Sequence, residues 1–464
     1  MAEVTPLAPK ALLVTLGCAK NLVDSEHMVA LLERAGYAVE VRDAEALADA
    51  RADLGVVNTC GFIAAARAES LAVIHELARL KEEGRVGRLV VGGCLAQGHA
   101  GELLRQVPQV DAVVGTGEFP RLAEIVRALG RGEPVQAVAA PAYRYDAPLP
   151  RARLTPPYMA YVKIAEGCDH TCTFCVIPRL RGRYRSRPPE AVVAEVEALA
   201  AEGVREVNLV AQDCSAYGRD LAGRPLLPEL LARLNAVPGL RWIRLLYNYP
   251  TTFTREVAEA LAGLDKACHY VDLPFQHGSD RILAAMGRGG RRADLLRRLE
   301  QIRAVLPDAV FRSAFIVGFP GETEADFRAL LSFLREAQLD YAGFFAYSRE
   351  AGTPAAELRR QVPEDVKERR LARAMAVQER VSLRRNRARV GRVLEVLVEG
   401  EEPGQPGFFR GRWRGQAPEV DGCVIFSAPG PLRPGELVDV RVTWAEEYDL
   451  RGVACGWPTA GRGK

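Results

Sequence analysis

Short apolar segments alternate with helical patterns along most of the chain, and this alternation restricts the possible folds more than any other feature. In the first part, apolar segments lie at residues 11–16, 54–57 and 89–91, and helical patterns follow at 21–35, 64–81 and 96–107. Strands that alternate with helices form a parallel sheet covered by helices on both faces. We therefore predict an α/β, flavodoxin-like domain at residues 1–140, followed by a Pro- and Tyr-containing linker at 141–157.

The middle of the chain repeats this alternation with more units. Six apolar strand segments and their helices, within residues 158–388, predict a partial (β/α)6 barrel with its chemistry at the carboxyl ends of the strands. A long basic helix is expected from Pro363 to about Arg389. Residues 389–464 contain short strands separated by Gly and Pro, which predicts a small antiparallel β-barrel. Three domains follow.

Composition narrows the class of protein. The hydrophobic content of 48% and the charged content of 26% are those of a folded globular chain. No apolar run reaches the roughly 18 residues that a membrane-spanning helix needs, and the first residues do not resemble a signal peptide. We therefore expect a cytoplasmic protein without a membrane partner. In that compartment its ten cysteines stay reduced, so they are core residues, metal ligands or catalysts.

Cys168, Cys172 and Cys175 form a C-x3-C-x2-C motif directly after the first strand of the middle domain. Three thiolates on one loop can hold three irons of a 4Fe-4S cluster and leave the fourth iron open. Zinc with His170 as a fourth ligand, and incidental core cysteines, are the alternatives. The spacing resembles that of the radical S-adenosylmethionine (SAM) enzymes, which implies that the open iron binds SAM. Phe174, just before the last cysteine, fits that superfamily too.

A second set of three cysteines, Cys18, Cys60 and Cys94, lies in the first domain. Each follows the carboxyl end of a predicted strand, and these ends meet at one edge of a parallel sheet. The three thiolates could hold a second cluster with its own open iron, although single cysteines at such places are often only buried small side chains. The other four cysteines have no partner at ligand spacing, so packing is expected for Cys214, Cys268, Cys423 and Cys455.

Polar and glycine residues follow several strands of the middle domain at the same predicted rim. We expect these residues, together with Phe174, to contact SAM or substrate; they are Gln212, Asp213, Gln276, Gly318 and Glu322. Arginines alternate just after the cysteine loop, at positions 179, 181, 183, 185 and 187. They form either a solvated basic face or a site for a carboxylate.

The chain as a whole resembles the methylthiotransferases of the radical SAM superfamily, over nearly its full length. The segments that carry the resemblance are TLGCAKNLVDSE at 15–26, QDCSAYG at 212–218, LPFQH at 273–277, YSRE at 347–350 and EYDLRG at 447–452. Ala19, Cys214 and Gly278 depart from the usual residues, and none of them is a candidate ligand. The resemblance implies that the carboxyl-terminal barrel is a TRAM domain.

Within that family the chain is most similar to the members that methylthiolate an aspartate of small-subunit ribosomal protein S-twelve. The resemblance implies two 4Fe-4S clusters, one binding SAM and one auxiliary, and two SAM molecules for each product. One SAM donates a methyl group to sulfur at the auxiliary cluster, and the other yields the radical that activates the β-carbon of the aspartate. It also implies a sulfur donor and a reductant such as flavodoxin or ferredoxin.

Two other functions remain as alternatives. A tRNA adenosine methylthiotransferase would share the fold and both clusters. The tail, with 10 basic and 11 acidic side chains, is a poor phosphate binder, so nucleic acid is not expected as the primary partner. A ferredoxin-like electron carrier would normally supply four cysteines to each cluster, and a structural zinc protein would not need a six-unit α/β domain.

Overall fold

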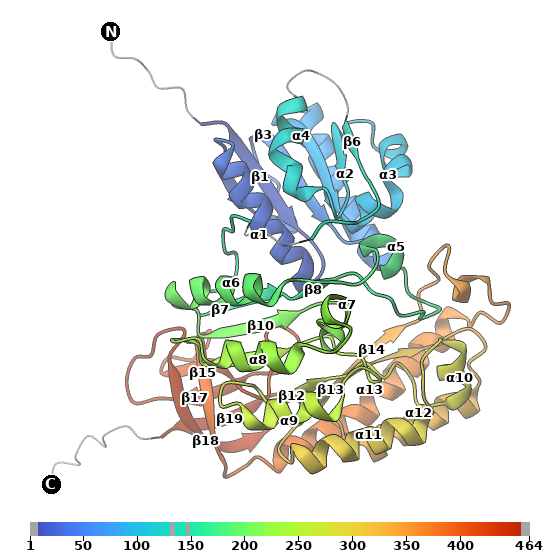
Figure 1. Cartoon of the computed structure of the whole chain (residues 1–464), viewed down its shortest axis with the longest axis vertical. Coiled ribbons are helices and arrows are strands. Elements are labelled where there is room, and N and C mark those ends of the chain that lie inside the picture. The colour runs from blue at the N-terminus through green and yellow to red at the C-terminus, as the bar shows by residue number, and fades with distance from the viewer. Residues whose placement is uncertain (1–7, 130–134, 145–148, 456–464) are drawn as a thin grey trace.

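The computed structural model describes residues 8–129, 135–144 and 149–455 (Figure 1). An amino-terminal α/β domain lies at the top of Figure 1, a larger α/β domain lies below it, and a β-barrel flanks the larger domain. In the described part of the chain, every helix is too short or too polar to cross a lipid bilayer.

The amino-terminal domain is built on a six-stranded parallel sheet in the order β2-β1-β3-β4-β5-β6. This order contains the 2-1-3-4-5 arrangement of flavodoxin-like folds, so the predicted fold class is confirmed. The strands are β1 (Lys10–Thr15), β2 (Ala38–Val41), β3 (Ala52–Thr59), β4 (Val86–Gly93), β5 (Ala112–Val114) and β6 (Val135–Ala137). The helices are α1 (Ala19–Arg34), α2 (Ala64–Glu82), α3 (Cys94–Gln106) and α4 (Leu122–Leu129), with short 3-10 turns at Ala44–Ala46 and Phe119–Arg121.

Helices cover both faces of this sheet, which explains why its strands are continuously apolar. Leu12 and Val14 pack on the side of α2 and α3, whereas Ala11 and Leu13 pack on the side of α1 and α4. The sequence pattern did not reveal β2, β5, β6 or α4. Three of the four are only three or four residues long, too short for periodicity to separate them from loops.

The middle domain contains six parallel strands in two three-stranded sheets, β7-β10-β11 and β12-β13-β14. A parallel bridge between Ile243 and Ala267 lies between the two sheets, as expected for an open barrel. The strands are β7 (Met159–Lys163), β10 (Glu206–Val210), β11 (Trp242–Leu245), β12 (Tyr270–Asp272), β13 (Val310–Val317) and β14 (Tyr341–Ala346). A small hairpin joins β8 (Ala165–Glu166) to β9 (Arg185–Ser186).

Helices pack against the outer face of these sheets, and a large apolar core lies between the two layers (Figure 1). They are α6 (Pro189–Ala201), α8 (Leu227–Asn235), α9 (Arg255–Gly263), α11 (Arg292–Val305) and α12 (Glu324–Ala337). The short helices α5 (Ile177–Arg181), α7 (Arg219–Ala222) and α10 (Asp280–Ala285) and the 3-10 turns at Cys214–Ala216 and Pro354–Glu357 lie in the connections, and α5 contacts α3 of the amino-terminal domain. The long basic helix α13 (Glu364–Arg387) leads to the last domain, close to the predicted limits.

The last domain is a closed five-stranded barrel in the order β15-β16-β17-β19-β18. Its strands are β15 (Val393–Glu401), β16 (Phe408–Trp413), β17 (Val424–Ser427), β18 (Leu437–Ala445) and β19 (Leu450–Ala454). Four neighbouring pairs are antiparallel, as predicted, but β17 and β19 pair in parallel. The strand β18 lies between them in the sequence, whereas in the barrel β17 and β19 are direct neighbours. The sequence pattern missed β19, which follows β18 after a short turn.

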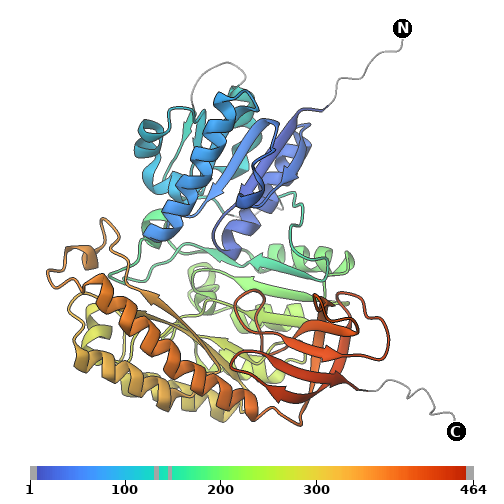
Figure 2. The same cartoon turned by 180° about the vertical axis from the view of Figure 1, so that it is seen from behind.

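The barrel is attached to the amino-terminal ends of the middle-domain strands through buried charges (Figure 2). Glu206, the first residue of β10, accepts hydrogen bonds from Arg244 Nε at 3.0 Å and from Arg412 of β16 at 2.7 Å. Trp242 of β11 donates to Glu395 at 2.9 Å, and the Tyr270 hydroxyl of β12 donates to a carboxylate of the barrel. These contacts cover the end of the strands opposite to the expected site, so the carboxyl ends remain available.

We predict that Glu206→Gln lowers the free energy of unfolding by about 3–5 kcal/mol. The substitution removes the carboxylate that Arg244 and Arg412 share, and both arginines stay buried without it. Urea unfolding followed by circular dichroism measures the change. The matched control is Glu229→Gln, which removes one carboxylate of an exposed pair with Arg224 and should change stability by less than about 1 kcal/mol. Equal effects of the two substitutions would contradict this account of the interface.

Candidate functional site

The loop with Cys168, Cys172 and Cys175 follows β8 at the carboxyl end of the first middle-domain strand and ends at α5. Backbone hydrogen bonds fix it: Cys168 N donates to Gly182 O at 3.0 Å, and Cys175 N donates to Cys172 O at 3.1 Å. Gly167 has φ +84°, and a Cβ there would lie 2.1 Å from Arg183 O, so the entry into the loop requires glycine. All three cysteines are partly exposed, and desolvation raises the pKa of Cys168 to about 11.

The structure brings Cys18, Cys60 and Cys94 together at the carboxyl edge of the amino-terminal sheet. Cys18 precedes α1, Cys60 directly follows β3, and Cys94 begins α3 after β4. A Cβ on Gly17 would lie 2.8 Å from the Cβ of Cys60 and 3.2 Å from its Sγ, so glycine lets these two turns approach. The three thiols are close enough to shift one another's pKa, and burial raises the pKa of Cys94 to about 11.

The donor chemistry of both sets fits a 4Fe-4S cluster, because each set supplies three thiols and would leave one iron open for a further ligand. Among the residues that the structure describes, no three His, Cys, Asp or Glu side chains lie close enough together to hold one metal ion.

The two sets lie near the contact between the domains, where Cys94 packs with Val176 and Leu180, just after Cys175. Arg181 of the same segment reaches across this contact. Its segment directly follows the Cys175 loop, yet its Nε donates to Cys94 Sγ at 3.3 Å in the other domain. Its Nη1 donates to Asp24 at 2.8 Å and to Glu166 at 3.1 Å. Arg181 is 2% exposed, so this arginine is neither solvated nor free for a substrate carboxylate.

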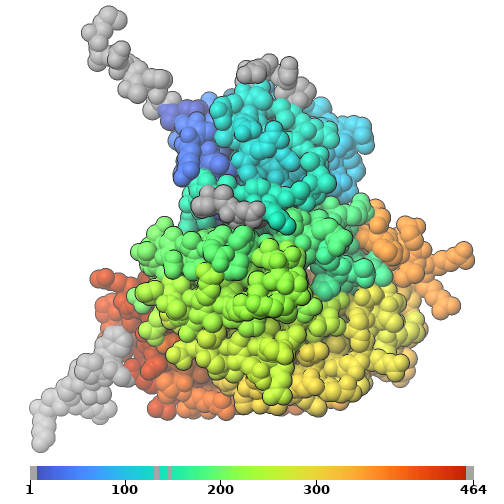
Figure 3. Space-filling view, viewed as in Figure 1, coloured from blue at the N-terminus to red at the C-terminus, as the bar shows by residue number. Residues whose placement is uncertain are grey.

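Lys163 completes this buried charge cluster, which we define as Asp24, Lys163, Glu166 and Arg181. Its Nζ donates to Asp24 at 2.5 Å and to Glu166 at 2.6 Å. The residues come from α1 of one domain and from β7, β8 and α5 of the other. In Figure 3 the blue-to-cyan amino-terminal domain lies directly on the green part of the middle domain.

Lys20 lies beside the charge cluster, in the first turn of α1. Its Nζ is 3.2 Å from the ring centroid of Tyr247, which follows β11. Burial alone would lower the pKa of Lys20, but its neighbours, above all Tyr247 and Cys18, outweigh burial and hold that pKa above its ordinary value. Desolvation would likewise raise the pKa of Cys18, but Lys20 and Arg181 lower it overall.

On the middle-domain side, a polar network supports the cysteine loop. The Asp213 carboxylate contacts His170 Nε2 at 2.8 Å and accepts hydrogen bonds from Ser215 at 2.6 Å and Thr252 at 2.8 Å. The His170 ring stacks on Tyr249 with 3.5 Å between centroids. Asp213 is fully buried, and through its contact with His170 its carboxylate orients the cysteine loop.

The remaining predicted contact residues lie around the same rim with different surroundings. Gln212 donates to Glu166 at 2.5 Å, which links it to the charge cluster. Phe174 packs against an apolar cluster that includes Met286 and Tyr347. Gln276 has φ +72°, a conformation that is rare outside glycine and concentrates at functional sites.

Contacts within the protein account for the presence of Gly318 and Glu322 at this turn. A Cβ on Gly318 would lie 2.3 Å from the side chain of Lys367, so the close approach is that of α13 and not of a ligand. Glu322 accepts hydrogen bonds from Gly318 N at 2.7 Å and from Arg370 at 2.9 Å, and these contacts hold the turn after β13. A direct role of either residue toward SAM remains a prediction.

Several buried polar atoms at the rim lack a hydrogen-bond partner within the described residues. Both side-chain polar atoms of Asn248 and the Gln212 carbonyl belong to this group. Buried polar groups are nearly always satisfied, so such atoms indicate a polar ligand. Their position after β10 and β11, next to the Cys168 loop, fits a polar cofactor such as SAM.

Sequence reasoning missed Lys20, Asp24, Lys163 and Tyr247, and treated Arg181 as one of five equivalent arginines. The spacing of Lys20 and Asp24, four residues apart, places both on one face of α1 and was the available signal. For Tyr247 and Lys163 the sequence offers no such signal.

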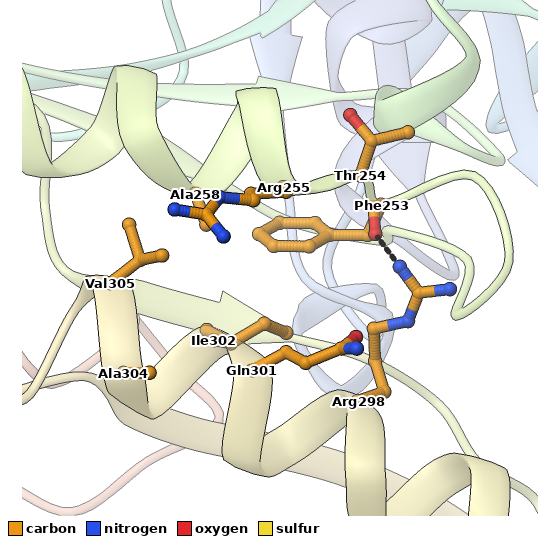
Figure 4. Close-up of a pocket in the computed structure, with 9 residues that line it drawn as sticks. All are labelled: Phe253, Thr254, Arg255, Ala258, Arg298, Gln301, Ile302, Ala304 and Val305. Atoms are coloured by element: carbon orange, nitrogen blue, oxygen red, sulfur yellow. Dashed lines mark hydrogen bonds between the residues drawn. The ribbon is translucent and has the colours of Figure 1, made fainter.

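One surface cleft of about 250 Å³ lies away from these residues, between α9 and α11 (Figure 4). Phe253, Thr254 and Arg255 line one side, and Arg298 and Ile302 line the other. Arg298 closes its end by donating to Phe253 O at 3.0 Å. The cleft lies among the outer helices and contains no cysteine, so it has no part in the chemistry of the two sets.

Comparison with known proteins gives three family matches along the chain. Residues 10–115 match the uncharacterized protein family UPF0004, residues 162–334 match the radical SAM superfamily, and residues 390–455 match the TRAM domain. Among solved structures, the radical SAM methyltransferase TsrM from Kitasatospora setae has a TM-score of 0.55 at 21% identity and covers 75% of each chain. At this level of identity, the similarity to TsrM shows that the two proteins share a fold.

The fold and the family matches together define a radical SAM enzyme with an additional amino-terminal domain and a TRAM barrel. The ribosomal protein uS12 methylthiotransferase RimO of Pelotomaculum thermopropionicum is 48% identical over 95% of this chain and 98% of its own length. Its counterpart from Desulforudis audaxviator is 50% identical over 96% of each chain. The chain belongs to the RimO family of methylthiotransferases.

We predict that Arg181→Met lowers the free energy of unfolding by about 3–5 kcal/mol, because Asp24 and Glu166 then share Lys163 as their remaining cluster cation. Urea unfolding of anaerobically prepared protein measures the change. Arg183→Met serves as control, because the Arg183 side chain is 86% exposed and its pair with Asp169 is solvated. An Arg181→Met protein as stable as the Arg183→Met protein would contradict a structural role for the cluster.

Proposed function

We propose that this protein methylthiolates the β-carbon of an aspartate of ribosomal protein uS12, with two SAM molecules and a sulfur donor. The observation that carries the proposal is the contact of Cys94, from one set, with the segment that directly follows Cys175 of the other: Cys94 packs with Val176 and Leu180 and accepts a hydrogen bond from Arg181. Full-length similarity to proteins named for this activity supports the substrate.

In this proposal Cys168, Cys172 and Cys175 hold the cluster that binds SAM, and Cys18, Cys60 and Cys94 hold the auxiliary cluster. The bound clusters and SAM supply the radical and sulfur chemistry that protein side chains cannot perform. The chain itself positions both clusters. Arg181 stabilises negative charge on Cys94 Sγ, and hydrogen bonds to such sulfurs tune a cluster's reduction potential.

The middle-domain rim holds SAM next to the first cluster. Phe174, Gln212, Asp213, Gln276, Gly318 and Glu322 are the proposed contact residues, and Asn248 joins them because its buried amide has no described partner. Asp213 acts through His170 and the loop, and Glu322 acts through the backbone of Gly318. Closure of the amino-terminal domain over this rim excludes water from the reaction.

The remaining assignments follow from the same proposal. The domains are residues 1–140 for the auxiliary cluster, 158–388 for SAM and 389–464 for the TRAM barrel, with a linker at 141–157. A reductant such as flavodoxin or ferredoxin supplies electrons, a sulfur donor renews the auxiliary cluster, and the reaction takes place in the cytoplasm.

Mass spectrometry tests the substrate. We expect the reconstituted enzyme, incubated anaerobically with SAM, reductant and sulfide, to add a methylthio group to an aspartate peptide of uS12. Unmodified tRNA, offered in a separate tube, should gain no mass. A gain on a tRNA adenosine and none on uS12 would contradict the proposed substrate while keeping the fold and both clusters.

Cysteine substitutions test the division of labour between the clusters. Cys172→Ala should abolish SAM cleavage and product, because it removes a ligand of the SAM-binding cluster. Cys60→Ala should abolish methylthiolation and leave some SAM cleavage. Each variant should retain about half of the roughly eight irons per chain, and Cys268→Ala, at a buried position away from both sets, serves as control. Methylthiolation by a Cys60→Ala enzyme that lacks the second cluster would refute the two-cluster arrangement.

A further inference from the structure

The ammonium group of Lys20 lies at the contact between the domains without a carboxylate partner among the described residues. The residue is 9% exposed. Within the described part of the chain, no carboxylate forms an ion pair with its Nζ and no acceptor takes a hydrogen bond from it; the face of Tyr247, 3.2 Å away, is its close contact. Its Nζ is not one of the fully buried polar atoms that lack a partner, and Cys18 and Glu166 lie near enough to favour its positive charge. Lys20 therefore offers an accessible cation to an anionic ligand at this contact.

The charge cluster beside Lys20 is paired internally. The adjoining charge cluster has two cations, Lys163 and Arg181, and two carboxylates, Asp24 and Glu166. Each cation contacts both carboxylates, so the cluster neutralises itself. Lys20 adds one positive charge beside it.

The position of Lys20 is also unfavourable for the helix that carries it. Lys20 lies in the first turn of α1, where the helix dipole favours acidic side chains, and α1 has no acidic residue there. Its contact Tyr247 has φ +59°, a left-handed conformation that costs energy for a side chain of this kind. Local conflicts of this kind concentrate at functional sites.

Lys20 is close to one set of cysteines and contacts a segment that reaches the other. It follows Cys18 by two residues, and it contacts Tyr247 at the carboxyl end of β11. Two residues further on, the Tyr249 hydroxyl lies 4.0 Å from Cys172 Sγ. The proposed reaction changes the β-carbon of an aspartate, one bond from its side-chain carboxylate. That carboxylate must be held between the two clusters while both act on the neighbouring carbon.

We propose that Lys20 binds the side-chain carboxylate of the substrate aspartate and thereby selects an acidic residue for modification. This inference rests on the proposed function. The carboxylate binds the Lys20 ammonium beside Tyr247, and the positive end of α1 adds to the attraction. Lys20 is in this sense a specificity-determining residue that also orients the β-carbon.

Binding to the holoenzyme without SAM tests the proposal by fluorescence anisotropy. The probes are uS12 and a uS12 variant in which the modified aspartate is replaced by Asn, which keeps the shape and removes the charge. We expect wild-type enzyme to bind the Asp form about 10- to 100-fold more tightly, because a charge-assisted contact is lost with Asn. In Lys20→Met enzyme the two forms should bind within about twofold of each other.

Two further variants separate charge from packing. Lys20→Arg keeps the charge and should keep the preference for the Asp form, and Lys10→Met, at an exposed lysine at the start of β1, should behave as wild type. Iron content and residual SAM cleavage establish that each variant still holds its clusters. A preference for Asp that persists in Lys20→Met, an equal loss in Lys20→Met and Lys20→Arg, or equal binding of both forms by wild type would each overturn the inference. Absence of any modification of uS12 would instead overturn the proposed function.

Discussion

The buried charge cluster of Asp24, Lys163, Glu166 and Arg181 is the interaction on which the rest of the structure depends. Its members come from two domains, and each cation contacts both carboxylates. Such clusters add little net stability compared with an apolar contact, but displacement of either domain would leave charges buried and unpaired. They therefore hold the domains, and with them the two sets of cysteines, in one relative position.

The opposite end of the middle domain is fixed in the same way. Glu206 joins β10 to Arg412 of the TRAM barrel, and the contacts of Trp242 and Tyr270 lie beside it at the first residues of their strands. These contacts fix the amino-terminal ends of the strands, whereas the cysteine loop and the partnerless polar atoms of Asn248 and Gln212 lie at the carboxyl ends. This division between a structural end and a functional end is general among barrels of parallel strands.

Much of the fold was predictable because it rests on local patterns. The long strands of the first domain, the six strands of the middle domain and helix α13 follow from apolar runs and helical periodicity. The short strands β2, β5 and β6 were not predicted, because three or four residues are too few to show a period. The strand β19 was not predicted because its five residues, LRGVA, include Arg and Gly and form no apolar run. The C-x3-C-x2-C spacing revealed one candidate cluster site, and the position of three cysteines directly after predicted strands revealed the other.

The sequence by itself determined the order of the elements, the loop geometry of Cys168 to Cys175 and the strand ends that carry Cys18, Cys60 and Cys94. Only the tertiary structure decided which charges meet. It buried Arg181 against Cys94 and left Arg183 in solvent, and it placed Lys20 on the ring of Tyr247 without a carboxylate partner among the described residues. The physical reason is the range of the interactions. Periodicity and turns act over a few residues, whereas a buried charge can pair with a side chain from a distant part of the chain, as Arg181 does with Asp24, 157 residues away.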